Sequence, residues 1–202
     1  DTTENDLINS ELNKTALLSY LLYENGRVSV DAMSPKDRFG NQFNSATPLI
    51  ANSIGKSFTA YLLGHAICQG YIKSPFQTLS DWQILEDTLY SDIQLIELLN
   101  MRAGDQKYTN MDGLVEIDFN RNDFFLKSPN NRSIKSMAQN ELRNSKKSRV
   151  YWNYSTLPPK LVINYIDHKV PEGFSKLFYQ ILDDHIGTEH PVSIDYSTGN
   201  RS

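Results

Sequence analysis

Residues 53–72 read SIGKSFTAYLLGHAICQGYI, and this stretch decides what the chain can be. Its apolar side chains recur every third or fourth position, the pattern of one face of an α-helix. The positions are Phe58, Leu62, Leu63, Ala66 and Ile67. Gly70 suits the helix end, because glycine adopts the left-handed conformation that stops a helix. The sequence therefore predicts a helix over residues 53–70, with Ser53 and Lys56 together in its first turn.

The lysine is unexpected there, because a helix dipole disfavours positive charge near the N-terminus. One interpretation is chemical: a lysine held beside a serine and partly desolvated loses proton affinity, and can accept the serine proton. The other is structural, with Ser53 as a helix N-cap and Lys56 as a solvated side chain. Local sequence alone leaves both open.

Other elements follow from periodicity and turn signals. Residues 16–33 contain Glu24-Asn25-Gly26 between two apolar runs, which predicts a β-hairpin. Residues 34–50 are predicted to be loop. A short helix is expected over residues 92–101, capped near Ser91 or Asp92. Two more are expected near residues 157–167 and 172–186, and the polar residues 104–149 are predicted to be a partly helical insertion.

Composition bounds the function. The 202 residues are 39% hydrophobic, as in an ordinary globular protein, and their net charge of −4 gives no reason to expect nucleic acid as a partner. One cysteine excludes an internal disulfide, and the four histidines form no HExxH motif. We therefore expect no metal, no cofactor and no membrane span. No signal peptide is recognisable, so the cellular location is left open. The sequence does not indicate an oligomeric state.

Two motifs resemble the serine β-lactamase and penicillin-binding-protein superfamily, in particular its class C β-lactamase-like hydrolases, which include esterases and 6-aminohexanoate-dimer hydrolases. The run from Ser53 through Lys56, Ser57 and Phe58 to Gly70-x-Ile72 resembles the nucleophile helix of that family. Residues 93–104, IQLIELLNMRAG, resemble its Ile-Thr-x-x-x-Leu-Leu-x-Met-x-Ser-Gly run. The hairpin would match its first two strands. The resemblance implies Ser53 as nucleophile and Lys56 as its proton acceptor.

The family's second motif begins with a tyrosine, and the chain has two candidates. Tyr151-Trp-Asn153 matches the literal Tyr-x-Asn pattern, whereas Tyr154-Ser-Thr156 puts Leu161 and Val162 where the family has a buried leucine pair. From Tyr151 those places fall on prolines, which are not expected to be that pair. We therefore choose Tyr154 as the catalytic tyrosine. Thr156 then occupies a substrate-binding asparagine place, and its hydroxyl offers fewer contacts than an amide.

The third family motif, Lys-Thr-Gly or a variant, is not recognisable. Ser197-Thr198-Gly199 lacks the basic residue. His185-Ile186-Gly187 more closely resembles the Pro-Leu-Gly run that follows the second helical stretch in sequences of the family. A two-stranded hairpin cannot form a stable sheet alone. We therefore expect residues 1–202 to be part of a single β-lactamase/transpeptidase-like α/β (α+β) domain. It would have a hairpin at 16–33, a mostly helical lobe at 53–186, and further C-terminal strands outside the chain.

These features predict a serine hydrolase that cleaves a small-molecule amide or ester through an acyl-enzyme on Ser53, provided that the remaining strands are supplied. Two alternatives stay open. The chain could be a non-catalytic binding or scaffold protein that retains the fold, as Thr156 and the missing third motif would favour. It could also be a true β-lactamase or a peptidoglycan DD-peptidase.

Overall fold

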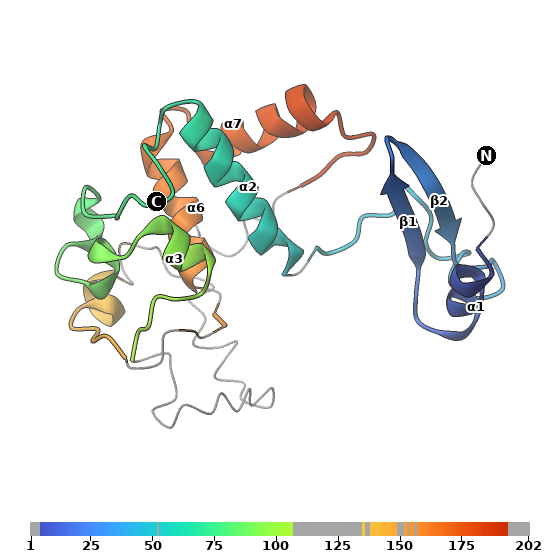
Figure 1. The fold of residues 1–202 in the computed structure, drawn as a ribbon, viewed down its shortest axis with the longest axis horizontal. Helices are drawn as coiled ribbons and strands as arrows, with labels where there is room; N and C mark the ends of the chain where they lie inside the picture. Colours follow the sequence, from blue (N-terminus) through green and yellow to red (C-terminus); the bar gives the residue numbers. More distant parts are fainter. Residues whose placement is uncertain are drawn as a thin grey trace. The chain divides into compact units, whose positions relative to one another are not determined.

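A computed structural model describes residues 5–51, 53–106, 135, 138–148, 152, 154–155 and 157–193. The chain divides into two compact units, Asp1–Ile50 and Ala51–Ser202. The described residues form a mixed α/β structure with one two-stranded antiparallel sheet (Figure 1). None of the helices in these residues combines the length and the apolar character that crossing a membrane requires.

The first unit contains the expected hairpin. Strand β1 (Ser19–Glu24) pairs antiparallel with β2 (Arg27–Met33), and their turn has positive φ at both Asn25 (51°) and Gly26 (78°). Two positive φ angles define the type I′ turn that matches strand twist, which is why Asn-Gly is a strong hairpin signal. This prediction from the sequence is confirmed.

A helix that is not among the elements expected from the sequence precedes the hairpin. Helix α1 (Asp6–Lys14) is capped by Asn5, whose side chain accepts hydrogen bonds from the amides of Leu7 (3.1 Å) and Ile8 (3.2 Å). Its Leu12 is buried, as is Val30 on β2. The Asn5 cap, followed by Asp6 in the first turn, is the signal that could have revealed this helix.

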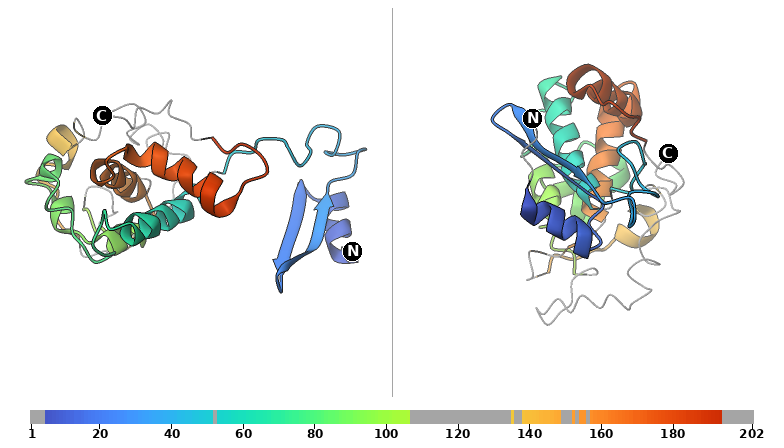
Figure 2. Two further views of the ribbon diagram at one scale, coloured as in Figure 1. Left: turned by 90° about the horizontal axis from the view of Figure 1, so that it is seen from above. Right: turned by 90° about the vertical axis from the view of Figure 1, so that its right-hand side faces the viewer.

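The second unit is helical. Helix α2 (Ile54–Cys68) lies with α6 (Leu157–Lys169) and α7 (Gly173–Gln180), as both views in Figure 2 show. The helix predicted from residue 172 continues beyond α7 as a π-helical turn, η4 (Ile181–Ile186). The shorter elements are η1 (Gln83–Leu85), η2 (Leu89–Asp92), α3 (Leu95–Leu99) and η3 (Ala138–Leu142).

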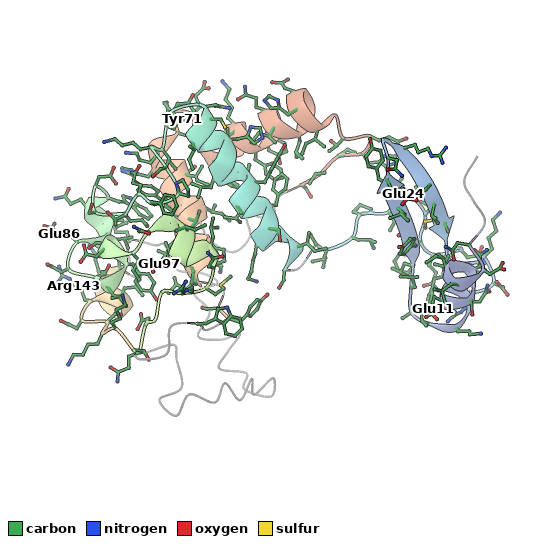
Figure 3. The ribbon with its side chains drawn as sticks, in the orientation of Figure 1. Glu11, Glu24, Tyr71, Glu86, Glu97 and Arg143 are labelled. Carbon is green, nitrogen blue, oxygen red and sulfur yellow. The ribbon has the colours of Figure 1, made fainter. Side chains whose placement is uncertain are left out.

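The apolar stripes predicted from the sequence form the core of this unit. Leu62, Leu63 and Ala66 of α2 are buried, and Leu161, Val162 and Ile166 of α6 are fully buried in the same cluster. Gly70 ends the turn after α2 with φ 79°, and Tyr71 donates its amide to the Ala66 carbonyl. Tyr71 lies just beyond the helix end (Figure 3). This packing fixes the direction of α2 and therefore the position of its first turn.

The second predicted helix is shorter than expected. It begins at Leu95 with Gln94 as its N-cap, so a cap at Ser91 or Asp92 is wrong. The physical reason is tertiary: Gln94 forms an isolated antiparallel bridge with Thr78, and the Leu95 amide donates to the Gln77 carbonyl. These contacts keep Gln94 extended until the helix starts.

A polar network attaches the segment before η1 to α6. The Tyr165 hydroxyl donates to Asp81 (2.6 Å) and accepts from the Gln77 amide (2.5 Å), while Lys169 donates to the other Asp81 oxygen (2.8 Å). Partial burial alone would raise the pKa of Asp81, but the hydrogen bonds from Lys169 and Tyr165 outweigh it and leave that pKa lowered. Burial, and then the Asp81 carboxylate, raise the pKa of Tyr165.

Candidate active site

Ser53 stands immediately before α2, as predicted. Its backbone is helical (φ −71°, ψ −9°) and its side chain makes no capping hydrogen bond. Instead, Ser53 Oγ accepts a hydrogen bond from Lys56 Nζ at 3.1 Å. The interpretation of Ser53 as a side-chain N-cap is therefore wrong, because a helical backbone at this position turns the hydroxyl away from the amides that a cap would bind.

Lys56 follows one turn later and is half-buried. Residues three apart on a helix are neighbours on its surface, which brings the amine back to the serine. Its Nζ also lies 4.8 Å from the centre of the Tyr154 ring, a cation–π distance. The amine is thus directed at the serine and the tyrosine rather than into bulk solvent, as the chemical interpretation requires.

Tyr154 reaches the same point from a distant part of the chain. Its hydroxyl donates a hydrogen bond of 2.6 Å to Ser53 Oγ, across a separation of 101 residues. The following Ser155 accepts from the Leu157 amide (3.3 Å), which fixes the start of α6 just after the tyrosine. Tyr154 therefore occupies the place that the register to Leu161 and Val162 predicts.

One step of that prediction needs correction. Pro158 and Pro159 are buried as well as Leu161 and Val162, so burial on α6 does not distinguish the two tyrosine registers. The first turn of α6 tolerates proline because its amides need no helical partner, and the whole turn packs inward. The competing candidate Tyr151, the expected substrate-binding Thr156 and the tail motif Ser197-Thr198-Gly199 all lie outside the described residues.

The surroundings of Tyr154 make its hydroxyl more acidic than an ordinary phenol. Its pKa is lowered, first by the hydrogen bond with Ser53 and then by the Lys56 ammonium. The neutral phenol donates to Ser53, as the structure has it. Once the phenol loses its proton, the Ser53 hydroxyl donates to the phenolate instead, which stabilises the charge. The pair can therefore exchange the direction of one hydrogen bond without moving an oxygen.

In this arrangement the exposed Ser53 hydroxyl contacts two groups, Lys56 and Tyr154, that can carry its proton. Serine becomes a nucleophile when a neighbouring base takes that proton. Gly187 has φ 64° and ends η4 as a left-handed cap. The run His185-Ile186-Gly187 therefore does not lie on a β-strand, where the third motif of the family would be expected. The second donor for an oxyanion is therefore not identified among the described residues.

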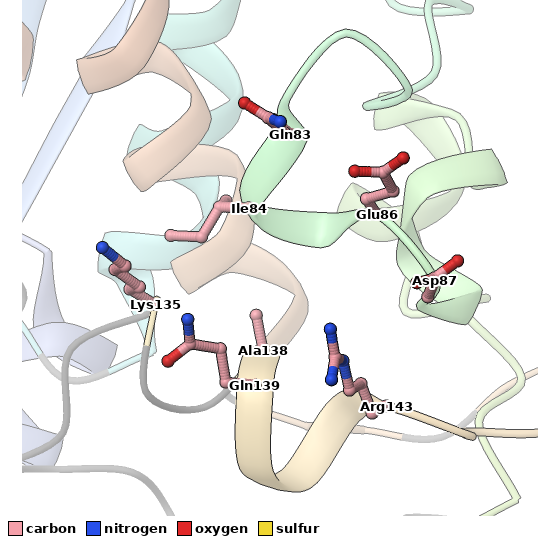
Figure 4. Close-up of a pocket in the computed structure, with 8 residues that line it drawn as sticks. All are labelled: Gln83, Ile84, Glu86, Asp87, Lys135, Ala138, Gln139 and Arg143. Atoms are coloured by element: carbon pink, nitrogen blue, oxygen red, sulfur yellow. The ribbon is translucent and has the colours of Figure 1, made fainter.

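A separate pocket of about 430 Å³ lies elsewhere in the second unit (Figure 4). No pattern in the sequence predicts this pocket. Its walls come from the segment around η1 and from η3, and they include two carboxylates and two cations. The lining residues are Gln83, Ile84, Glu86, Asp87, Lys135, Ala138, Gln139 and Arg143. Ser53, Lys56 and Tyr154 are not among them, so this hollow is distinct from the serine site.

Comparisons with known proteins do not assign the chain to a class. No protein family model matches the chain, and no curated protein matches it significantly.

Proposed function

We propose that the chain is a serine hydrolase of the β-lactamase-related type, with Ser53 as nucleophile and Lys56 and Tyr154 as its proton-handling partners. The observation that carries the proposal is the 2.6 Å hydrogen bond from Tyr154 to Ser53, next to the 3.1 Å contact from Lys56. The resemblance of the residue 53–72 and 93–104 motifs to that superfamily supports the same assignment.

The fold alone gives little reason for this convergence. Both hydrogen bonds are exposed to solvent, and exposed polar contacts contribute little to stability because water replaces them at small cost. Ser53 also gives up a cap hydrogen bond on α2 that would be worth about 1 kcal/mol. A reactive serine explains both features, since its oxygen must face solvent and a proton acceptor together.

The proposed reaction begins with a deprotonated Tyr154 or Lys56. That base takes the Ser53 hydroxyl proton as the serine oxygen bonds to the carbonyl carbon of an ester or amide, giving a tetrahedral oxyanion. The same proton passes to the leaving alcohol or amine as the carbonyl reforms, leaving an acyl group on Ser53. Water, deprotonated by the same base, then attacks the acyl carbon. The bond between that carbon and Ser53 Oγ breaks, the base returns the proton to the serine oxygen, and the acid is released. No cofactor is required for these steps.

A covalent serine probe tests the proposal. The chain is incubated with a fluorophosphonate, and the mass of the intact protein and of its peptides is measured. We expect one adduct, on Ser53, that is absent from Ser53→Ala. Ser57→Ala is the matched control, because Ser57 lies exposed one turn along the same helix and has no proposed role. Unmodified protein under saturating probe would contradict the hydrolase and favour a non-catalytic binding or scaffold protein.

The substrate class is a second question, answered after labelling. A chromogenic β-lactam and a p-nitrophenyl ester present the same electrophilic carbonyl with different leaving groups. Turnover of the ester alone would favour an esterase or amidase, whereas turnover of the β-lactam would favour a β-lactamase or a DD-peptidase. Both activities should disappear in Ser53→Ala and persist in Ser57→Ala.

A further inference from the structure

His65 and His185, far apart in the sequence, lie against each other in the second unit. His65 is in the last turns of α2 and His185 is in the π-helical turn η4. Their ring centres are 5.0 Å apart and the ring planes are inclined by 42°. His65 is half-buried and His185 is exposed. Neither imidazole has a hydrogen-bond partner among the described residues.

The distance between the rings fits a shared ligand. Two imidazoles bound to one tetrahedral zinc ion, with Zn–N bonds of about 2.0–2.1 Å, have ring centres roughly 5 Å apart. An inclination between the planes is compatible with this arrangement, because each ring rotates freely about its metal bond. We propose that His65 and His185 form a two-histidine site for a divalent transition metal, zinc in the first instance, which links α2 to η4.

The local structure limits the His65 ring and anchors the turn that carries His185. Tyr61 packs edge-on against His65, with ring centres 4.7 Å apart, and so limits the rotation of that imidazole. His185 belongs to a π-helical turn, a rare geometry that is frequent at functional sites. The core residues Ile181 and Leu182 of that turn are buried, so the turn cannot drift away from the protein.

The two imidazoles would supply two of the four ligands of a tetrahedral zinc ion. Within the described residues, no group of three or more histidine, cysteine or acidic side chains gathers at one point. Water would thus complete the coordination, and the site would be reversible.

The experiment is a calorimetric titration of the full chain with zinc chloride at neutral pH. All proteins carry Cys68→Ser, so that the exposed thiol cannot contribute. We expect His65→Gln and His185→Gln each to weaken zinc binding at least tenfold, since one imidazole cannot chelate. His168→Gln and His190→Gln are matched controls and should bind as the parent does, because both are exposed histidines outside the pair.

A second readout is the melting temperature. Zinc should raise the melting temperature of the parent and of both control variants, but not that of His65→Gln or His185→Gln. Circular dichroism without metal shows whether each variant is folded. His185 is exposed, so its replacement leaves the core intact and keeps the test decisive if His65→Gln misfolds. Equal zinc affinity in the parent and His185→Gln, or no measurable affinity in the parent, would overturn the proposal.

Discussion

Lys56 Nζ lies 4.8 Å from the centre of the Tyr154 ring, so one ammonium contacts both the ring of the tyrosine and the serine oxygen that the tyrosine hydroxyl binds. A cation at this distance attracts the ring and stabilises a negative charge on the phenol oxygen. Lys56 therefore acts on Ser53 in two ways, by direct contact and through Tyr154. The two proposed bases form one unit.

Tyr154→Phe separates the ring from the hydroxyl. The phenyl ring keeps its contact with Lys56, whereas the 2.6 Å hydrogen bond to Ser53 is lost. If Tyr154 handles the serine proton, the rate of Ser53 acylation should fall by roughly 10²–10⁴, the usual effect of removing a general acid–base. The rate is measured as phosphonylation of Ser53 by the fluorophosphonate probe, a reaction that displaces fluoride and needs the same loss of the serine proton. An unchanged rate in a folded variant would mean that the hydroxyl has no part in proton transfer.

The double variant Lys56→Ala/Tyr154→Phe tests whether the two residues act together. We expect strong non-additivity, with the double variant losing little more activity than the more damaging single variant. The reason is that either single substitution already disables a function that the two residues share. The acylation rates of the parent, both single variants and the double variant give the coupling. A double loss equal to the product of the single losses would show independent action and contradict the shared proton relay.

The pH dependence follows from the direction of the Tyr154 shift. The pKa of this phenol is lowered from its ordinary value near 10 by Ser53 and Lys56. The active form has lost a proton, so acylation should increase as pH rises and level off above the lowered pKa. Tyr154→Phe should abolish this rise or move it. A parent profile that falls with increasing pH over this range would contradict the assignment of the base.

Much of the site could be predicted from the sequence because it depends on local geometry. Three-residue spacing on a helix brings Lys56 to Ser53 whatever the rest of the chain does. The place of Tyr154 could be predicted only from the resemblance, since no spacing rule relates residues 101 positions apart. The helix α1 was missed although it has a recognisable Asn5 cap. The late start of α3 was not predictable, because the bridge between Thr78 and Gln94 is tertiary.

The Asp81–Tyr165 pair predicts a stability effect away from the serine site. Tyr165 is fully buried and its hydroxyl contacts both Asp81 and Gln77. Tyr165→Phe should lower the free energy of unfolding by about 1–3 kcal/mol, because it leaves polar partners without their hydrogen bond. Lys169→Met is the control: its ion pair with Asp81 is partly exposed and should be worth about 0–1 kcal/mol. Urea denaturation measures both.

The same tyrosine gives an alkaline signature. Burial and Asp81 raise the pKa of Tyr165 above its ordinary value near 10. Above pH 10 the tyrosine of an unfolded chain releases its proton, while Tyr165 in the folded chain keeps it. The folded state then binds more protons, so the free energy of unfolding falls as pH rises. Tyr165→Phe should show a smaller decline in unfolding free energy above pH 10 than the parent. Equal declines would mean that Tyr165 ionises alike in both states.

Two glycines give opposite predictions for the same substitution. An added Cβ at Gly40 would lie 2.2 Å from the Ser34 backbone oxygen, whereas one at Gly64 on α2 meets nothing within 4 Å. Gly40→Ala should therefore destabilise the first unit by about 1–3 kcal/mol, as overpacking usually does. Gly64→Ala should stabilise α2 by about 0.8–1.0 kcal/mol, the difference in helix propensity.

Hydrogen exchange distinguishes the two effects, because it reports stability amide by amide. Gly40→Ala should speed exchange in β1 and β2, which adjoin the loop that begins at Ser34. Gly64→Ala should slow exchange in α2 and leave the Ser53 acylation rate unchanged, since Gly64 lies about three turns beyond the serine. Normal exchange of the hairpin amides in Gly40→Ala would show that the loop relaxes around a methyl group without disturbing the strands.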